Sequence, residues 1–150
     1  MVRILAWLQA AVLGGNGLVM LFAGQWWYGA VPGVTGTGPY NPHFVRDIGA
    51  AYLVCGAAHV AFALRPRQAW PALVAAAAFL VLHAAIHVFD AVCGTRPLAD
   101  IARDFGGVFV PALIALGLAA WRAPPIRKEV LNAQGPAQPP DRQARTPLGL

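Results

Sequence analysis

Residues 70–89 decide the fold of this chain; they read WPALVAAAAFLVLHAAIHVF. The stretch contains no Asp, Glu, Lys or Arg, and a helix of about 20 apolar residues crosses the hydrocarbon core of a bilayer. Three further stretches, before and after it, have the same character: 4–22, 48–64 and 105–121. The sequence therefore predicts an all-α fold, a polytopic membrane protein with four transmembrane helices in an up-down bundle.

The composition supports a membrane protein. Hydrophobic residues make up 58% of the 150 residues and charged residues only 11%, whereas soluble domains average about 25% charged. A soluble domain of this size buries only about two-thirds of its surface, so it could not hide this much apolar area. The net charge of +5 raises the question of nucleic acid. The basic residues are scattered over loops and the C-terminal region, which argues against a nucleic-acid partner.

The positions of Lys and Arg predict the orientation of the bundle. Four spans place both termini on one side, together with most of the basic residues: Arg3, Arg65, Arg67, Arg122, Arg127, Lys128, Arg142 and Arg145. The opposite side carries Arg46, Arg96 and Arg103. The positive-inside rule then predicts that both termini are cytoplasmic. Aromatic residues near the predicted helix ends, such as Trp70 and Trp26, fit the belts found at membrane interfaces.

Two segments outside the spans differ in character. The outer loop 25–44 is rich in Gly, Pro and aromatic residues, and loops of this length are usually functional or disordered. Its aromatic content predicts a folded cap over the outer end of the bundle. From residue 123 the chain is rich in Pro, Gln and Arg without apolar periodicity. We therefore predict a four-helix transmembrane domain over 1–122 and a disordered cytoplasmic tail over 123–150.

Polar residues gather at the outer, periplasmic end of the predicted bundle. His83, His87 and Asp90 lie within about 60° of one another on one helix face. The second span begins at the same end with three further polar residues, His43, Arg46 and Asp47. Ionisable groups at membrane depth usually face the interior of a bundle or a water-filled cavity. The sequence thus predicts a polar pocket that opens to the periplasmic side.

Three interpretations of this polar cluster are open. In the first, its role is structural: the histidines hydrogen-bond across helices and Arg46 pairs with an acidic residue, which is Asp47, Asp90 or Asp104. In the second, the cluster binds a transition metal (Zn, Fe or Cu), because His83, His87 and Asp90 can supply nitrogen and oxygen ligands from one face, with Asp47 or His43 opposite.

In the third interpretation, the cluster performs acid/base chemistry on a small lipophilic molecule. Asp47 and Asp90 flank the substrate, and Arg46 holds one carboxylate ionised. A carboxylate pair whose protonation states are split provides both an acid and a base. The ligand would be contacted by aromatic and imidazole side chains near the cap, which are Tyr40, His43 and Tyr52.

His59 is separate from this cluster. It lies in the second span, about 12 Å from His83 along the membrane normal. Two axial haem ligands must sit on opposite sides of one iron, so this spacing disfavours haem bound by His59 and His83. We expect His59 to form a hydrogen bond between helices instead.

A resemblance rests on the stretch from Pro32 to Leu53, above all on TGPYNPHFVRDIGAAYL, residues 37–53. This stretch resembles a motif of small uncharacterised bacterial four-helix membrane proteins, and the helical part as a whole is loosely similar to the DoxX-like group. The resemblance implies a multi-pass protein of the bacterial inner (plasma) membrane. DoxX-like proteins include subunits and accessories of membrane oxidoreductases. The resemblance therefore also implies an alternative function, that of a non-catalytic accessory subunit or assembly factor with a membrane-protein partner. A homo-oligomer is a further possibility.

Overall fold

The structure is a computed structural model that describes residues 1–121, so the predicted tail over 123–150 lies outside the described residues. Residues 1–121 form helices and no strand. Four spans are long and apolar enough to cross a membrane: α1 (Val2–Phe22), α3 (Pro42–Leu64), α4 (Trp70–Val92) and the segment Asp100–Trp121. The predicted all-α fold with four long apolar helices is confirmed, and it fits a membrane protein.

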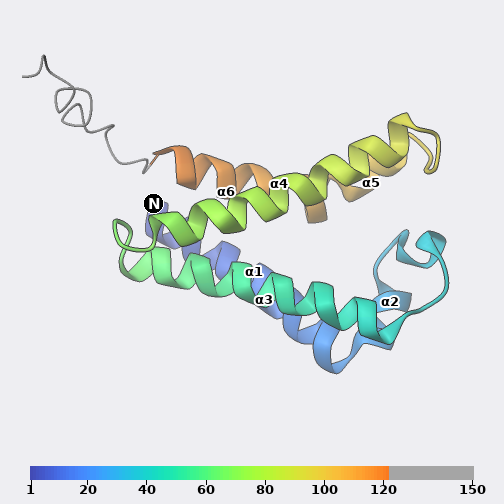
Figure 1. The fold of residues 1–150 in the computed structure, drawn as a ribbon, viewed down its shortest axis with the longest axis horizontal. Helices are drawn as coiled ribbons and strands as arrows, with labels where there is room; N and C mark the ends of the chain where they lie inside the picture. The colour runs from blue at the N-terminus through green and yellow to red at the C-terminus, as the bar shows by residue number, and fades with distance from the viewer. Residues whose placement is uncertain (122–150) are drawn as a thin grey trace, which may run out of the picture.

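The four spans form two pairs. α1 packs most extensively against α3, and α4 packs against α6 (Val110–Trp121), the last part of the fourth span. The two pairs are close together where the chain begins and spread apart toward the other end (Figure 1). We call the first of these the turn end, which carries Arg3, the α3–α4 turn (65–69) and Trp121. The opposite end, which carries residues 23–41 and 93–104, is the loop end.

The α1–α3 pair is held together by the close approach of its backbones. A Cβ atom on Gly17 would lie 2.6 Å from the carbonyl oxygen of Gly49, and one on Gly49 would lie 2.9 Å from Cβ of Met20. Lipid tails are as apolar as the helices, so helices in a membrane associate through such close packing rather than by leaving water. Glycine at these two positions is what allows α1 and α3 to touch.

α3 begins earlier than its apolar stretch, at Pro42 rather than near residue 48. The side chain of Asn41 caps the helix by accepting hydrogen bonds from the backbone N–H groups of His43 and Phe44, each at 3.1 Å. Pro42 occupies the first turn, where its missing N–H costs no hydrogen bond. The first turns of α3 therefore carry its polar residues at the loop end, beyond the apolar stretch.

The fourth span is not a regular helix. It consists of a short helix α5 (Asp100–Asp104), a π-helical segment η2 (Phe105–Phe109) and α6. The irregularity is a π-helical turn just before Pro111, a residue that supplies no backbone N–H for a regular helix. The side chain of Gln9 in α1 donates a hydrogen bond of 2.8 Å to the carbonyl oxygen of Pro111, which ties α1 to α6. Segments of π-helix are often found at functional sites, and this one directly follows Asp104.

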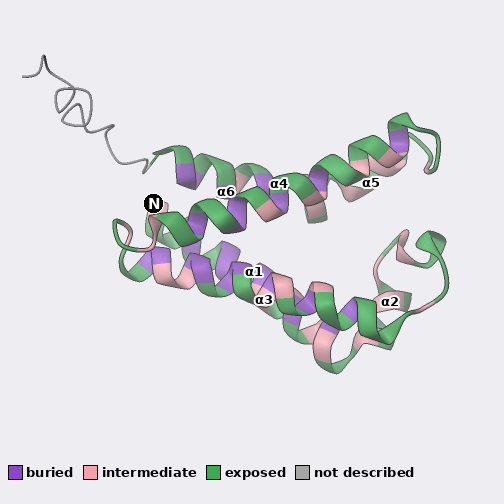
Figure 2. Cartoon of the chain, viewed as in Figure 1, coloured by how far each residue is buried: buried purple, intermediate pink, exposed green. Residues whose placement is uncertain are grey.

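Buried residues lie mainly where the helices face one another, and exposed residues lie on the outside (Figure 2). Many of the exposed residues are large and apolar. Phe62, Leu73 and Leu80 are almost fully buried, whereas Leu82 is 66% and Phe89 is 65% exposed. An exterior this apolar would be costly in water. It suits a lipid environment, in agreement with the composition.

Candidate functional site

A network of charged side chains occupies the loop end of the α4–α6 pair, and Asp104 is at its centre. Its Oδ2 atom lies 2.8 Å from Nδ1 of His87 on α4. The guanidinium group of Arg103 donates two hydrogen bonds to the same carboxylate, from Nε to Oδ1 at 2.8 Å and from Nη2 to Oδ2 at 3.1 Å. A carboxylate can only accept these hydrogen bonds, so Nδ1 of His87 carries the proton.

The network continues through Asp100. Its Oδ1 accepts a hydrogen bond of 2.7 Å from Nη1 of Arg103. Its Oδ2 lies 2.8 Å from Nη2 of Arg96, an ion pair by distance whose angles are too poor for a hydrogen bond. The two arginines and two aspartates balance each other in charge, and these side chains are only 13–30% exposed. Removal of one member would leave a partly exposed charge without its partner.

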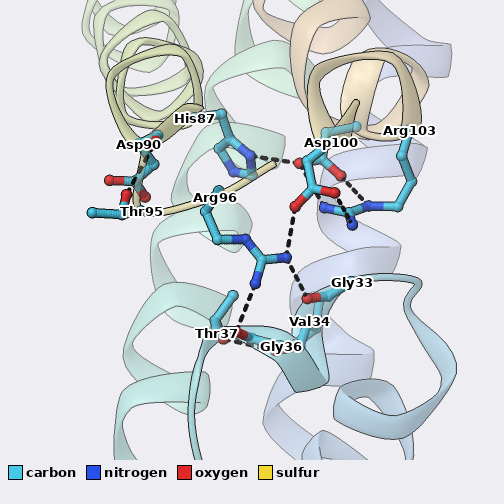
Figure 3. A network of polar contacts seen from close by, with 11 residues as sticks. Gly33, Val34, Gly36, Thr37, His87, Asp90, Thr95, Arg96, Asp100 and Arg103 are labelled. Atoms are coloured by element: carbon cyan, nitrogen blue, oxygen red, sulfur yellow. Dashed lines mark hydrogen bonds and ion pairs between the residues drawn. The ribbon is translucent and has the colours of Figure 1, made fainter. Parts of the chain in front are cut away.

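Arg96 joins this network to the outer loop. Its guanidinium donates to the carbonyl oxygens of Gly36 at 2.6 Å and Gly33 at 3.2 Å. Figure 3 shows Arg96 extending from the chain after α4 to these carbonyl groups. Gly33 has a φ of +84°, and a Cβ atom there would collide with the guanidinium of Arg103. The loop therefore touches both arginines at a position that requires glycine.

The loop itself is folded, as predicted. It contains the short helix α2 (Gly24–Ala30) and the 3-10 turn η1 (Val34–Thr37). The hydroxyl of Tyr28 donates to the carbonyl of Gly38, and the ring of Tyr28 lies against that of Tyr40, with 5.4 Å between centroids. Nε1 of Trp27 donates to Oδ1 of Asn16 in α1 at 2.8 Å. These contacts make residues 23–41 a cap on the loop end.

We expect Arg96→Ala to loosen this cap. The change removes the donor of both hydrogen bonds to the cap carbonyls, and hydrogen bonds from charged groups contribute about 1.5–3 kcal/mol. Amide hydrogen exchange of residues 33–38 should become at least about ten-fold faster, while the amides in the middle of α3 stay unchanged. Arg46→Ala is the matched control, because Arg46 is exposed and contacts no carboxylate within residues 1–121. Equal exchange in the two variants would contradict the role given to Arg96.

Toward the middle of the bundle, the network meets an aromatic cluster. The ring centroids of His87 and His83 are 4.9 Å apart. The ring of His83 stacks on that of Phe79, with 6.2 Å between centroids, and lies edge-on to the ring of Tyr52, with 6.0 Å between centroids. The side chain of His83 therefore points from α4 toward α3. Asp104, His87, His83 and Tyr52 therefore follow one another from the loop end toward the interior.

The other residues predicted for the site lie elsewhere at the loop end. His43 and Asp47 face each other on one turn of α3, with Nε2 and Oδ2 at 3.4 Å, and both are well exposed. Arg46 pairs with none of the acidic residues of the described chain, contrary to the structural interpretation, because Arg103 and Arg96 take that place. Asp90 uses its backbone carbonyl to accept hydrogen bonds from the N–H groups of Thr95 and Arg96 and from the Thr95 hydroxyl. Catalytic roles for Asp47, Asp90 and Arg46 stay predictions.

The metal interpretation gains no support. Across residues 1–121, no group of three His, Cys, Asp or Glu side chains has an arrangement that could hold a metal ion. His83 and His87 are neighbours, but Nδ1 of His87 is taken by Asp104 and His83 faces aromatic rings.

His59 does not form the hydrogen bond between helices that we expected. Its Nδ1–H donates to the carbonyl oxygen of Cys55, one turn earlier in α3, at 2.8 Å. The side chain is fully buried, and Nε2 has no hydrogen-bond partner within the described chain. Position on a helix face could not reveal this, because the i−4 carbonyl competes with any partner on another helix.

Sequence reasoning missed Asp100, Arg103 and Arg96 as members of the site. A signal was present, since Arg96 and Asp100 are four residues apart and Asp100 and Arg103 three apart, the spacings at which helical side chains meet. Asp100 and Arg103 lie in the short helix α5, whereas Arg96 lies in the loop before it, and all three precede the apolar stretch of the fourth span. In comparisons with known proteins, no protein-family model, no curated protein and no solved structure matches this chain.

Proposed function

We propose that this protein holds an acid/base site for a small lipophilic molecule at the loop end of its bundle. His87 is the group that exchanges a proton, and Asp104 positions it. The observation that carries the proposal is the hydrogen bond of 2.8 Å between Nδ1 of His87 and Oδ2 of Asp104. His83 and Tyr52 continue from this pair into the aromatic cluster.

The chemistry follows from the tautomer. With its proton on Nδ1, the neutral imidazole has a free lone pair on Nε2 and can accept a proton there. The carboxylate of Asp104 stabilises the imidazolium that forms, as carboxylates do in His–Asp pairs of enzymes. Arg103 binds both oxygens of that carboxylate and keeps it ionised. His87 could then return the proton to another atom of the same molecule, which is an isomerisation, a cyclisation or, with water, a hydration.

The surroundings suit a lipophilic substrate with one polar group. Phe79 and Tyr52 offer aromatic surface next to His83. The side chain of His87 is 30% exposed, so a molecule can reach it.

We further propose that the loop end faces the periplasm, with both termini in the cytoplasm of the bacterial inner membrane. Positively charged residues resist translocation, and this is the basis of the positive-inside rule. Of the 11 Lys and Arg residues of the sequence, the loop end carries three, Arg46, Arg96 and Arg103. The remaining eight belong to the side that carries both termini and the α3–α4 turn. This excess of basic residues supports a cytoplasmic turn end.

The test is a search for a bound molecule. We expect the full-length protein, extracted gently from its own membrane, to retain a small molecule detectable by native mass spectrometry. The His87→Ala variant should retain at least about ten-fold less of this molecule than the wild type. His43→Ala is the matched control, because His43 also pairs with an aspartate at the loop end but is 88% exposed. Equal loss from both variants would contradict the site. Retention of a protein partner without any small molecule would instead favour the accessory-subunit function.

A further inference from the structure

A second polar feature lies at the turn end, far from the proposed acid/base site. The structure has a shallow pocket of about 500 Å³ there, lined by Arg3, Arg65, Pro66, Arg67 and Gln68. Arg3 belongs to the first turn of α1, and the other four residues form the α3–α4 turn. Three arginine residues from two separate parts of the chain thus line one hollow.

We propose that this pocket binds the headgroup of an anionic phospholipid through its phosphate groups. The guanidinium fork matches phosphate oxygens in geometry and charge. Within residues 1–121 the acidic residues are Asp47, Asp90, Asp100 and Asp104, and all of them lie at the loop end. The described chain therefore supplies three positive charges to the pocket and no carboxylate to neutralise them. A headgroup that carries two phosphates matches this charge better than one that carries a single phosphate.

The depth of the pocket favours a lipid over a soluble anion. α3 ends at Leu64 and α4 begins at Trp70, so Arg65 and Arg67 stand within a few ångströms of the ends of two apolar spans. The phosphates of a bilayer lie at that level. Nε1 of Trp70 donates to the carbonyl of Ala119 at 2.9 Å, which joins the beginning of α4 to the end of α6 beside the pocket. Basic pockets between transmembrane helices are common lipid headgroup sites.

The pocket is also held in place before any ligand arrives. The backbone N–H of Arg65 donates to the carbonyl of Ala61 at 2.8 Å, and the N–H of Ala69 donates to the carbonyl of Arg65 at 3.0 Å. These hydrogen bonds fix the turn at both of its ends. The ordering of its backbone therefore costs little when a headgroup binds.

The experiment measures lipid retention by the full-length protein in nanodiscs of phosphatidylcholine that contain a small fraction of cardiolipin, a lipid with two phosphates. We expect cardiolipin to be enriched on the wild type. The triple variant Arg3→Gln, Arg65→Gln, Arg67→Gln should bind cardiolipin about 100-fold more weakly, since each basic residue near an anionic surface contributes about five-fold in affinity. The corresponding triple lysine variant keeps the charges and should retain part of the binding. Arg46→Gln is the matched control at the loop end and should bind as the wild type does.

Two results would overturn the proposal. The first is equal cardiolipin retention by the wild type and the triple glutamine variant when circular dichroism shows that both are folded. The second is binding of inorganic pyrophosphate, in detergent without lipid, as tightly as the cardiolipin headgroup. That result would make the pocket a site for a soluble anion. Neither result depends on whether His87 and Asp104 act on a substrate.

Discussion

Gly17→Ala is expected to destabilise the bundle by about 2 kcal/mol, although alanine is the better helix former. The new methyl group would lie 2.6 Å from the carbonyl oxygen of Gly49 and 3.0 Å from the backbone nitrogen of Leu53. Both obstacles are backbone atoms of α3, so no side chain can rotate away to make room. α1 and α3 would have to separate, and the close packing that holds them together in lipid would be lost along the pair.

Gly15→Ala is the control for this prediction. Gly15 lies on the same helix, and a Cβ atom there meets nothing within 4 Å. This substitution should be neutral or stabilise the protein by up to about 1 kcal/mol, because alanine loses less backbone entropy in a helix than glycine does. Titration with a denaturing detergent, followed by tryptophan fluorescence, measures the difference. If both variants unfold at the same detergent concentration, the α1–α3 contact is not as close as described.

Asp104→Asn is expected to invert the tautomer of His87. The amide keeps the size of the carboxylate but has only one acceptor oxygen, for which Nε–H and Nη2–H of Arg103 compete with Nδ1–H of His87. We expect the Nε–H of Arg103 to hold this oxygen. Its NH₂ group then faces Nδ1 of His87 and donates to it. The imidazole must carry its proton on Nε2, and the lone pair needed for proton abstraction is lost. In a site that works as a general base, such a change lowers kcat by about 10⁴-fold.

Nitrogen NMR of histidine-labelled protein measures this tautomer without knowledge of the substrate. The wild type should show His87 protonated on Nδ1, and Asp104→Asn should show it protonated on Nε2. Asp47→Asn serves as the control: its partner His43 is solvent-exposed and should stay unchanged, and the signal of His87 should too. A wild-type His87 already protonated on Nε2 would contradict the proposed role of the pair.

The charged network has two consequences that these experiments separate. It holds the cap to the α4–α6 pair through Arg96, which is a structural role. It also sets the tautomer of His87, which no structural role requires. Arg96→Ala tests the first and Asp104→Asn the second. If Arg96→Ala loosens the cap but Asp104→Asn leaves the tautomer of His87 unchanged, the network has a structural role alone. That result would favour an accessory subunit with a rigid loop end.

The number of apolar spans and the all-α class could be read from the sequence, because a bilayer imposes length and polarity on every span. The apolar run 70–89 and its three counterparts satisfy these conditions without reference to any partner. The folded cap could be predicted as well, since the aromatic residues between 25 and 44 need something to pack against. The gathering of His87 and Asp104 at one end followed from topology alone.

The sequence could not predict which side chains form ion pairs with one another. Arg46, Arg96 and Arg103 were all candidates for the same aspartates, and charge alone ranks them equally. Only the tertiary structure decided for Arg96 and Arg103. The short helix α5 carries both Asp100 and Arg103, and the loop before α5 brings Arg96 to Asp100. His59 likewise bonds within its own helix. Hydropathy constrains a residue's depth in the bundle, but the direction in which its side chain points depends on how helices rotate and loops close, and only the assembled fold determines that.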